Sequence, residues 1–184
     1  MNFARLQQTR IPDLAPVYGG ARGRTMSSRH QLYAWRALQE AGVKTIIDLR
    51  LTDHTDRLPA LCEQYGMHYF SYPVDTSAEA VSAMVERFPD FCGLIDTGDF
   101  YIACAMGLHR TDIALCAYWA FYGADRGIAP PQIHGYRQED GHTTDKLNRL
   151  LNAIYTAFTE RNGIIPMPQQ LFQERKAIIN RQAK

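Results

Sequence analysis

Three short apolar stretches, rich in β-branched and aromatic residues and separated by helix-like patterns, constrain this chain most. They cover residues 43–49, 67–74 and 100–103, and their length and composition are typical of buried strands. Neighbouring parallel strands need crossover connections, which are usually helices. The alternation therefore predicts an α/β fold with a mostly parallel central sheet flanked by helices.

Each early helix is expected to begin after a Ser or Thr whose hydroxyl can accept a hydrogen bond from the first turn. The expected pairs are Ser27 or Ser28 with a helix ending at Gly42, Thr55 with a helix up to Gly66, and Ser77 with apolar positions 80–85. Apolar spacing predicts three further helices, over residues 111–122, 144–159 and about 169–180. The C-terminal part is therefore expected to be helical.

The length and composition fit one domain. The chain has 184 residues, 46% of them apolar, which is enough to bury a sizeable core. No repeat or low-complexity linker interrupts it, so we expect a single domain over 1–184, with a core at about 15–125 and C-terminal helices at about 144–180. The formal net charge of +1 gives no reason to expect a nucleic acid partner.

Arginines gather near the N-terminus, where six of them face one acid, Asp13, before Glu40. The six are Arg5, Arg10, Arg22, Arg24, Arg29 and Arg36. Such a segment is expected to form a solvated surface, with attraction of an anion as the alternative.

The compartment is expected to be the cytoplasm. The first residues lack the apolar stretch of a secretory signal, and no run approaches the roughly 20 apolar residues of a membrane span. The four cysteines form no Cys-x-x-Cys pair. We expect Cys116 to be a core thiol, and Cys62 and Cys92 to be core thiols or partners that trap an oxidised Cys104.

The most informative segment runs from the strand at 100–103 through a tight loop into the helix at 111–122. Five residues separate Cys104 from Arg110, and their backbone N–H groups can converge at the N-terminus of the helix, where an anion is favoured. Gly107 permits a backbone geometry that a side chain would obstruct, and a guanidinium can hold two phosphate oxygens. The predicted phosphate-binding residues are Ala105, Met106, Gly107, Leu108, His109 and Arg110.

A cysteine in such a field should lose its proton more readily, and the thiolate is the nucleophilic form. Cys104 is therefore the predicted nucleophile. The hydroxyl of Thr111 could donate a hydrogen bond that helps the thiolate leave. The alternative is that Cys104 is a small buried residue at a strand end and Arg110 a surface residue.

The segment resembles the protein tyrosine and dual-specificity phosphatases, whose signature is Cys-x-x-Gly-x-x-Arg followed by Ser or Thr. The signature matches at Cys104, Gly107, Arg110 and Thr111, and the resemblance extends over about residues 15–125 through the segments 17–20, 42–50 and 72–75. It implies a phosphotyrosine-phosphatase-like α/β domain, a hydrolase without metal or other cofactor, and transfer of phosphate through a phosphocysteine.

The family also implies a general acid, an Asp on a loop roughly thirty residues before the nucleophile. Asp75 stands 29 residues before Cys104, just after a strand, and is our prediction, with a turn or capping role as the alternative. Asp90, Asp96 and Asp99 are the competitors, and 96–98 reads as a turn. Asp48 and Arg50 are expected to be structural.

Three positions differ from the family pattern. Ala103 stands where the family has a His that helps to organise the loop, Asp112 where Gly is common, and Leu108 where members acting on inositol pyrophosphates have Lys. The leading hypothesis is a protein tyrosine or dual-specificity phosphatase. The alternatives are a phosphatase of inositol phosphates or other small esters, a phosphate-binding pseudophosphatase, and a rhodanese-like sulfurtransferase.

Overall fold

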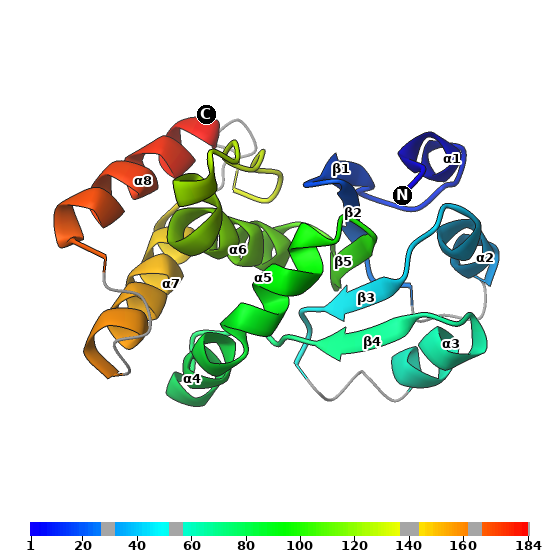
Figure 1. Ribbon diagram of the computed structural model, residues 1–184, viewed down its shortest axis with the longest axis horizontal. Helices are drawn as coiled ribbons and strands as arrows, with labels where there is room; N and C mark the ends of the chain where they lie inside the picture. The colour runs from blue at the N-terminus through cyan, green and yellow to red at the C-terminus, as the bar shows by residue number, and fades with distance from the viewer. Residues whose placement is uncertain (27–31, 52–56, 137–143, 162–166, 184) are drawn as a thin grey trace. The chain divides into compact units, whose positions relative to one another are not determined.

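A five-stranded sheet carries the segment from Cys104 to Thr111 at the end of its strand β5 (Figure 1). Its order is β1-β2-β5-β3-β4, with β1 antiparallel to β2 and every other pair parallel. The strands are β1 (Ala15–Val17), β2 (Gly20–Arg24), β3 (Thr45–Asp48), β4 (His68–Ser71) and β5 (Phe100–Cys104). The mostly parallel sheet flanked by helices is thus confirmed. The strands β3 and β4 lie in the predicted stretches, and β5 extends one residue beyond its stretch, to Cys104.

The computed structural model describes residues 1–26, 32–51, 57–136, 144–161 and 167–183. They form two compact units, each treated by itself below. The first comprises Met1–Pro73 and Pro89–Thr111, and the second Val74–Phe88 and Asp112–Lys184. The single domain over 1–184 stays a prediction.

The strands β1 and β2 were not predicted from the sequence. Their segment is rich in Gly and Arg, and Val17 is its single β-branched residue. The glycines of β2 let it lie close to β5: a Cβ on Gly20 would come within 2.6 Å of the Phe100 ring, and one on Gly23 within 2.4 Å of the Tyr101 hydroxyl. The fit to β5, rather than strand propensity, accounts for β2.

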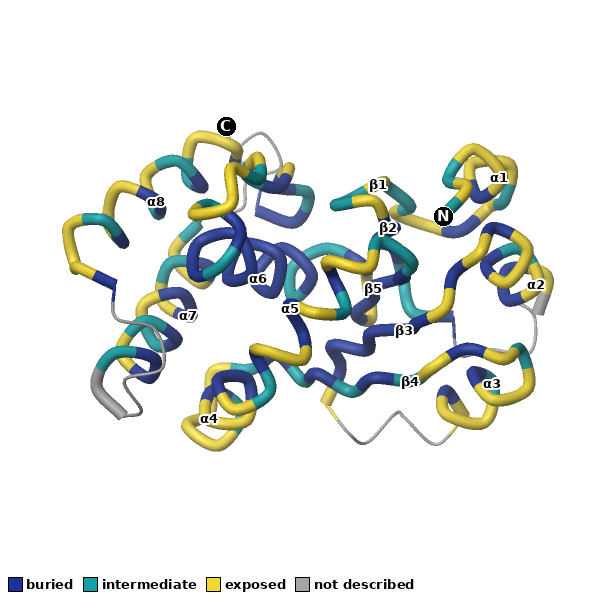
Figure 2. Tube along the Cα trace, in the orientation of Figure 1, coloured by how far each residue is buried: buried dark blue, intermediate teal, exposed yellow. Residues whose placement is uncertain are grey.

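Helices of the first unit pack on this sheet. They are α1 (Phe3–Gln7), α2 (Leu32–Glu40), α3 (Leu58–Gln64) and α5 (Phe88–Asp96), whose first residue belongs to the second unit. Trp35 and Leu38 of α2 share a buried cluster with Ile46 of β3 and Tyr101 of β5. The two strands β3 and β5 are buried along their whole length (Figure 2). The proposed caps Ser27, Ser28 and Thr55 lie outside the described residues.

The helix α5 was not predicted, and the expected turn at 96–98 is shifted. Asp96 is the last residue of α5, and the chain turns at Thr97 and Gly98, where Gly98 has φ +70°. Pro89 is the second residue of α5 and lacks the N–H that a first helical turn leaves unpaired. The helix can therefore begin directly after α4.

The second unit is helical, as expected. It contains α4 (Ala78–Glu86), most of α6 (His109–Tyr118), α7 (Asp145–Thr156) and α8 (Gln169–Gln182). The Ser77 cap is confirmed, because its Oγ accepts a hydrogen bond of 3.2 Å from the Ala80 N–H. Both α6 and α7 end in a π-helical turn, at Trp119–Gly123 and Ala157–Arg161.

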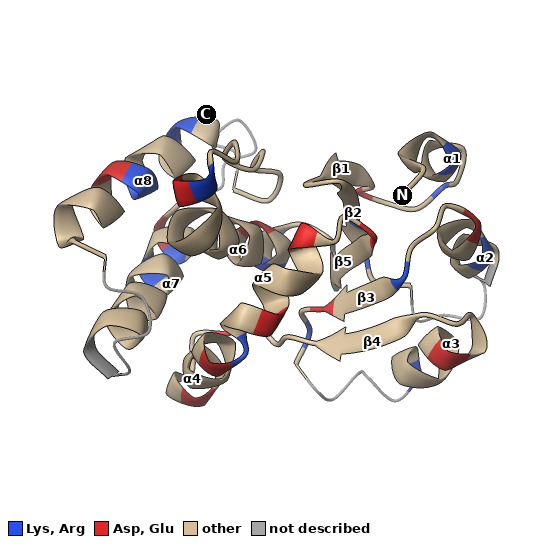
Figure 3. Ribbon diagram, viewed as in Figure 1, with Lys and Arg blue, Asp and Glu red and all other residues tan. Residues whose placement is uncertain are grey.

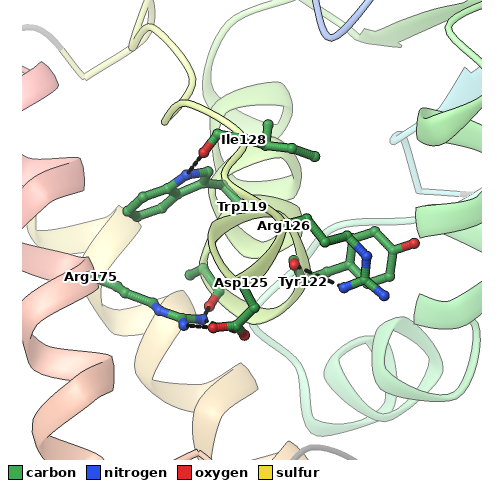
Figure 4. A network of polar contacts seen from close by, with 7 residues as sticks. Trp119, Tyr122, Asp125, Arg126, Ile128 and Arg175 are labelled. Atoms are coloured by element: carbon green, nitrogen blue, oxygen red, sulfur yellow. Dashed lines mark hydrogen bonds and ion pairs between the residues drawn. The ribbon is translucent and has the colours of Figure 1, made fainter.

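Polar groups around the first π-helical turn are satisfied by side chains (Figure 4). The Trp119 indole donates to the Ile128 carbonyl at 2.8 Å. Arg126 donates to the Tyr122 carbonyl at 3.1 Å, and its guanidinium carbon lies 3.5 Å from the centroid of the Tyr122 ring. Arg175 of α8 is buried and donates to the Ala120 carbonyl and to Asp125. These bonds tie α8 to the end of α6.

Acidic and basic side chains both occur on α7 and α8, whereas the charged residues within α3 and α4 are all acidic (Figure 3). In the part of the chain that is described, no helix has the length and apolar character needed to cross a bilayer.

Candidate active site

The predicted loop connects β5 directly to α6. Cys104 is the last residue of β5 and His109 the first of α6, with residues 105–108 forming the bend between them. Cys104 is 3% exposed, whereas Met106 at the tip of the bend is 46% exposed. The strand-loop-helix order expected from the sequence is therefore present.

Gly107 is the residue that fixes the shape of the bend. Its φ is +71°, and a Cβ there would lie 2.3 Å from the carbonyl carbon of Gly23 and 2.6 Å from the Arg24 nitrogen. Because those neighbours are backbone atoms of β2, no side chain fits without moving the sheet. The Gly107 N–H donates to the Cys104 carbonyl at 3.1 Å and closes the turn.

Arg22 holds the loop from the side of β2. The expectation of a solvated surface is wrong for this residue, which is 1% exposed. Its Nη2 donates to the carbonyl oxygen of Gly107 at 3.0 Å and to that of Leu108 at 3.1 Å. The Thr25 N–H, just after β2, donates to the Cys104 carbonyl at 3.0 Å. The carbonyl groups of Gly107, Leu108 and Cys104 thus all accept hydrogen bonds from Arg22 of β2 or from Thr25 just after it.

The first turn of α6 carries the two other signature residues. Arg110 is half-buried, and Thr111 is fully buried. The Thr111 hydroxyl has no hydrogen-bond partner among the residues that are described. Its predicted bond to the Cys104 thiol is not made in this structure, and that role stays a prediction.

Asp112, which follows the signature, binds backbone. Its side chain is fully buried and accepts hydrogen bonds from the N–H of His134 at 3.1 Å and of Gly135 at 2.6 Å. A carboxylate bound by backbone N–H groups is stabilised where it lies. Asp112 therefore fastens the segment at 134–135 to α6, a role that no local pattern indicated.

Asp99, a competitor for the general acid, is engaged elsewhere. It precedes β5, at the opposite end of that strand from Cys104. Hydrogen bonds from Lys44, at 2.9 Å, and from the amino terminus, at 3.1 Å, hold the pKa of its carboxyl below the usual value. A carboxyl that stays ionised there is a poor proton donor, so Asp99 is set aside.

Asp75, the predicted acid, belongs to the second unit. It is half-buried and lies two residues before the Ser77 cap of α4. Of the remaining competitors, Asp90 is exposed in the first turn of α5 and Asp96 ends that helix. The assignment of Asp75 stays a prediction.

Asp48 and Arg50 form a buried pair at the end of β3. The Arg50 guanidinium donates to the two carboxylate oxygens of Asp48 at 2.9 and 3.0 Å. The Tyr69 hydroxyl donates to the Asp48 carboxylate at 3.2 Å. Burial and the nearby Asp48 raise the pKa of Tyr69 to about 12. Both members of the pair are thus occupied within the fold, in agreement with the structural role expected for them.

Ala103 is 2% exposed and lies opposite Asp48 in the β3–β5 register. A cavity of about 10 Å³ beside it, also lined by Thr25 and Trp35, is about the size of one water. The methyl group of Ala103 offers no hydrogen bond, so other groups hold the loop.

All four cysteines are buried thiols outside any disulfide. Burial, with Asp48 nearby, raises the pKa of Cys62 to about 12, which makes it an unreactive core thiol. Cys116 is fully buried, as expected for a core residue. Within the described ranges, no three His, Cys, Asp or Glu side chains gather as metal ligands would.

No family model and no curated protein matches this sequence. Solved structures do match. One is a putative phosphatase from Shewanella putrefaciens, 17% identical, with 99% of each chain covered and a TM-score of 0.50. Another is the kinase associated phosphatase with its catalytic-site cysteine replaced by serine, 10% identical, covering 96% of this chain and 98% of the other, also with a TM-score of 0.50. This chain therefore has the fold of the tyrosine and dual-specificity phosphatases.

Proposed function

We propose that this protein is a cysteine-dependent phosphomonoesterase that acts through a phosphocysteine. One observation carries the proposal: the loop between Cys104 and Arg110 is pinned to β2 through Gly107, at the N-terminus of α6. A rigid bend with a thiol at one end and a guanidinium at the other suits a phosphate dianion.

In the first step, the Cys104 thiolate attacks phosphorus. An S–P bond forms as the P–O bond to the leaving group breaks, and Arg110 binds two of the non-bridging oxygens. Asp75 gives its proton to the leaving oxygen, so that an alcohol or phenol departs rather than its anion.

In the second step, water attacks the phosphocysteine. The Asp75 carboxylate takes a proton from the water, an O–P bond forms, and the S–P bond breaks to return the thiolate. The hydroxyl of Thr111 could then donate to the leaving thiolate. Two features of this chain suit the scheme. The Thr111 hydroxyl has no other partner in the described residues. The strands β4 and β5 are both parallel to β3, so the chain leaves β4 toward Asp75 at the same carboxyl end of the sheet where β5 ends at Cys104.

The substrate is proposed to be a phosphotyrosine-type phosphoprotein. Binding of inositol phosphates would gain support from N-terminal arginines lining the pocket, but Arg5 pairs with Glu40, Arg24 lies 3.7 Å from Asp13, and Arg22 binds loop carbonyls. The loop itself offers Met106 and Leu108 where a basic side chain would favour a polyphosphate.

Hydrolysis of para-nitrophenyl phosphate, measured from pH 5 to 8 without added metal, tests the proposal. Cys104→Ser should abolish turnover, whereas Cys92→Ala, at another buried thiol, should retain it. Asp75→Asn should lower kcat and remove the decline at rising pH that a general acid causes. Asp90→Asn, at an exposed competitor, is the matched control.

Two results would contradict the proposal. Turnover that survives in Cys104→Ser would exclude the phosphocysteine. A native chain that binds tungstate but hydrolyses nothing would make the protein a phosphate-binding pseudophosphatase, which Ala103 keeps as the second candidate.

A further inference from the structure

The loop has a buried support that its signature does not contain. Arg22 stands 85 residues before Gly107 in the sequence, outside the motif, and its guanidinium is enclosed between β2 and the bend. A single nitrogen, Nη2, binds both the Gly107 and the Leu108 carbonyl oxygen. Two successive peptide groups therefore present their oxygens to the same point.

The contact with Arg22 also fixes the direction of the N–H groups on the opposite side of the loop. In a trans peptide the C=O and the following N–H point in opposite directions. When the oxygens of Gly107 and Leu108 face Arg22, the N–H groups of Leu108 and His109 face away from it. The Leu108 N–H lies just before α6 and the His109 N–H at its first residue, where the positive end of the helix dipole favours an anion.

The loop needs such a support. The family's loop-organising His is replaced by Ala103, whose methyl group can form no hydrogen bond with the loop. Gly107, at φ +71°, has no side chain to hold its two flanking peptide groups in place. Without Arg22, those peptide groups could rotate and turn a carbonyl oxygen toward the anion.

We propose that Arg22 is the positioning residue of this loop: it orients the Leu108 and His109 N–H groups toward the phosphate by holding the carbonyls behind them. The inference rests on the proposed phosphatase function for the identity of the anion. The orientation of the peptide groups is testable without turnover.

The experiment compares the native chain with Arg22→Met, which removes the donors, and Arg22→Lys, which keeps one charged nitrogen that can reach carbonyls. Arg175→Met is the matched control, because Arg175 is also buried and also donates to a backbone carbonyl, in the second unit. Two quantities are measured: hydrogen exchange of the amides at 105–109, and the dissociation constant of inorganic tungstate.

In Arg22→Met, we expect the loop amides to exchange at least about tenfold faster and tungstate to bind about 10 to 100 times more weakly. Arg22→Lys should recover part of both effects. Arg175→Met should lower the melting temperature without changing either quantity below the unfolding transition.

Unchanged loop exchange in a folded Arg22→Met would overturn the inference, as would faster exchange with unchanged tungstate affinity. Equal effects in Arg175→Met would also overturn it, because they would reflect lost stability alone. A native chain that binds no tungstate would remove the proposed function, and the exchange data would then decide the role of Arg22 separately. If Arg22→Met does not fold, Arg22→Lys decides, since it should show intermediate values in both measurements.

Discussion

The loop in the first unit and the aromatic cluster in the second are held by different means. In the loop, backbone touches backbone: Gly107 lies against Gly23 and Arg24, and Arg22 binds two carbonyls. In the second unit, rings pack on rings. Phe121 lies 4.8 Å from Phe158, 5.6 Å from Phe172 and 6.5 Å from Phe88, measured between centroids.

Two glycines with the same backbone angle make the contrast sharper. Gly107 and Gly127 both have φ +71°. A Cβ on Gly107 would strike the backbone of β2, whereas one on Gly127 would meet no atom within 4 Å. The same backbone angle therefore excludes a side chain at Gly107 on steric grounds and leaves room for one at Gly127, because the neighbouring atoms differ.

The largest effect is expected on the stability of the second unit. Phe121→Ala removes a buried ring from the cluster and should lower the free energy of unfolding by about 3–5 kcal/mol. Phe121→Leu retains much of the apolar volume and should lose less. Urea unfolding of both variants checks this, and equal losses would show that ring packing, rather than burial, holds the cluster.

The next effect is expected on activity. Gly107→Ala should lower kcat/KM by about a hundredfold, because the loop has to move away from β2 and misplaces its N–H groups. Gly127→Ala has the same backbone strain and should cost only about 1–2 kcal/mol of stability. Kinetics with para-nitrophenyl phosphate and urea unfolding separate the two, and similar kcat/KM values would refute the claim that β2 sets the loop.

The smallest effect is expected at the other end of β5, where Asp99 is held by partly exposed ion pairs. Asp99→Asn should cost less than about 1 kcal/mol. Since Lys44 lowers the pKa of Asp99 in the folded state, this stability is present above the ordinary carboxyl pKa and is lost as pH falls through the lowered value. Urea unfolding at pH 7 and pH 2.5 should show the difference fading, and a constant difference would contradict it.

Local pattern was sufficient for part of this protein. The strands β3, β4 and β5 followed from short β-rich runs, α4 from the Ser77 cap, and α7 and α8 from apolar spacing. The segment from Cys104 to Thr111 could be recognised because its strand, bend and helix follow one another directly in the chain. In each case the determining contacts are between near neighbours in sequence.

The supports of the loop were decided by tertiary structure alone. Arg22 looked like one of several solvated arginines, and only pairing of β2 with β5 brings it to Gly107 across 85 residues. Asp112 finds the N–H groups of residues 134 and 135, and Asp99 finds Lys44, through the same kind of distant contact. The sequence by itself determined which residues form the loop. The fold determined what holds it, because burial and hydrogen-bond partners depend on segments that meet only when the chain is folded.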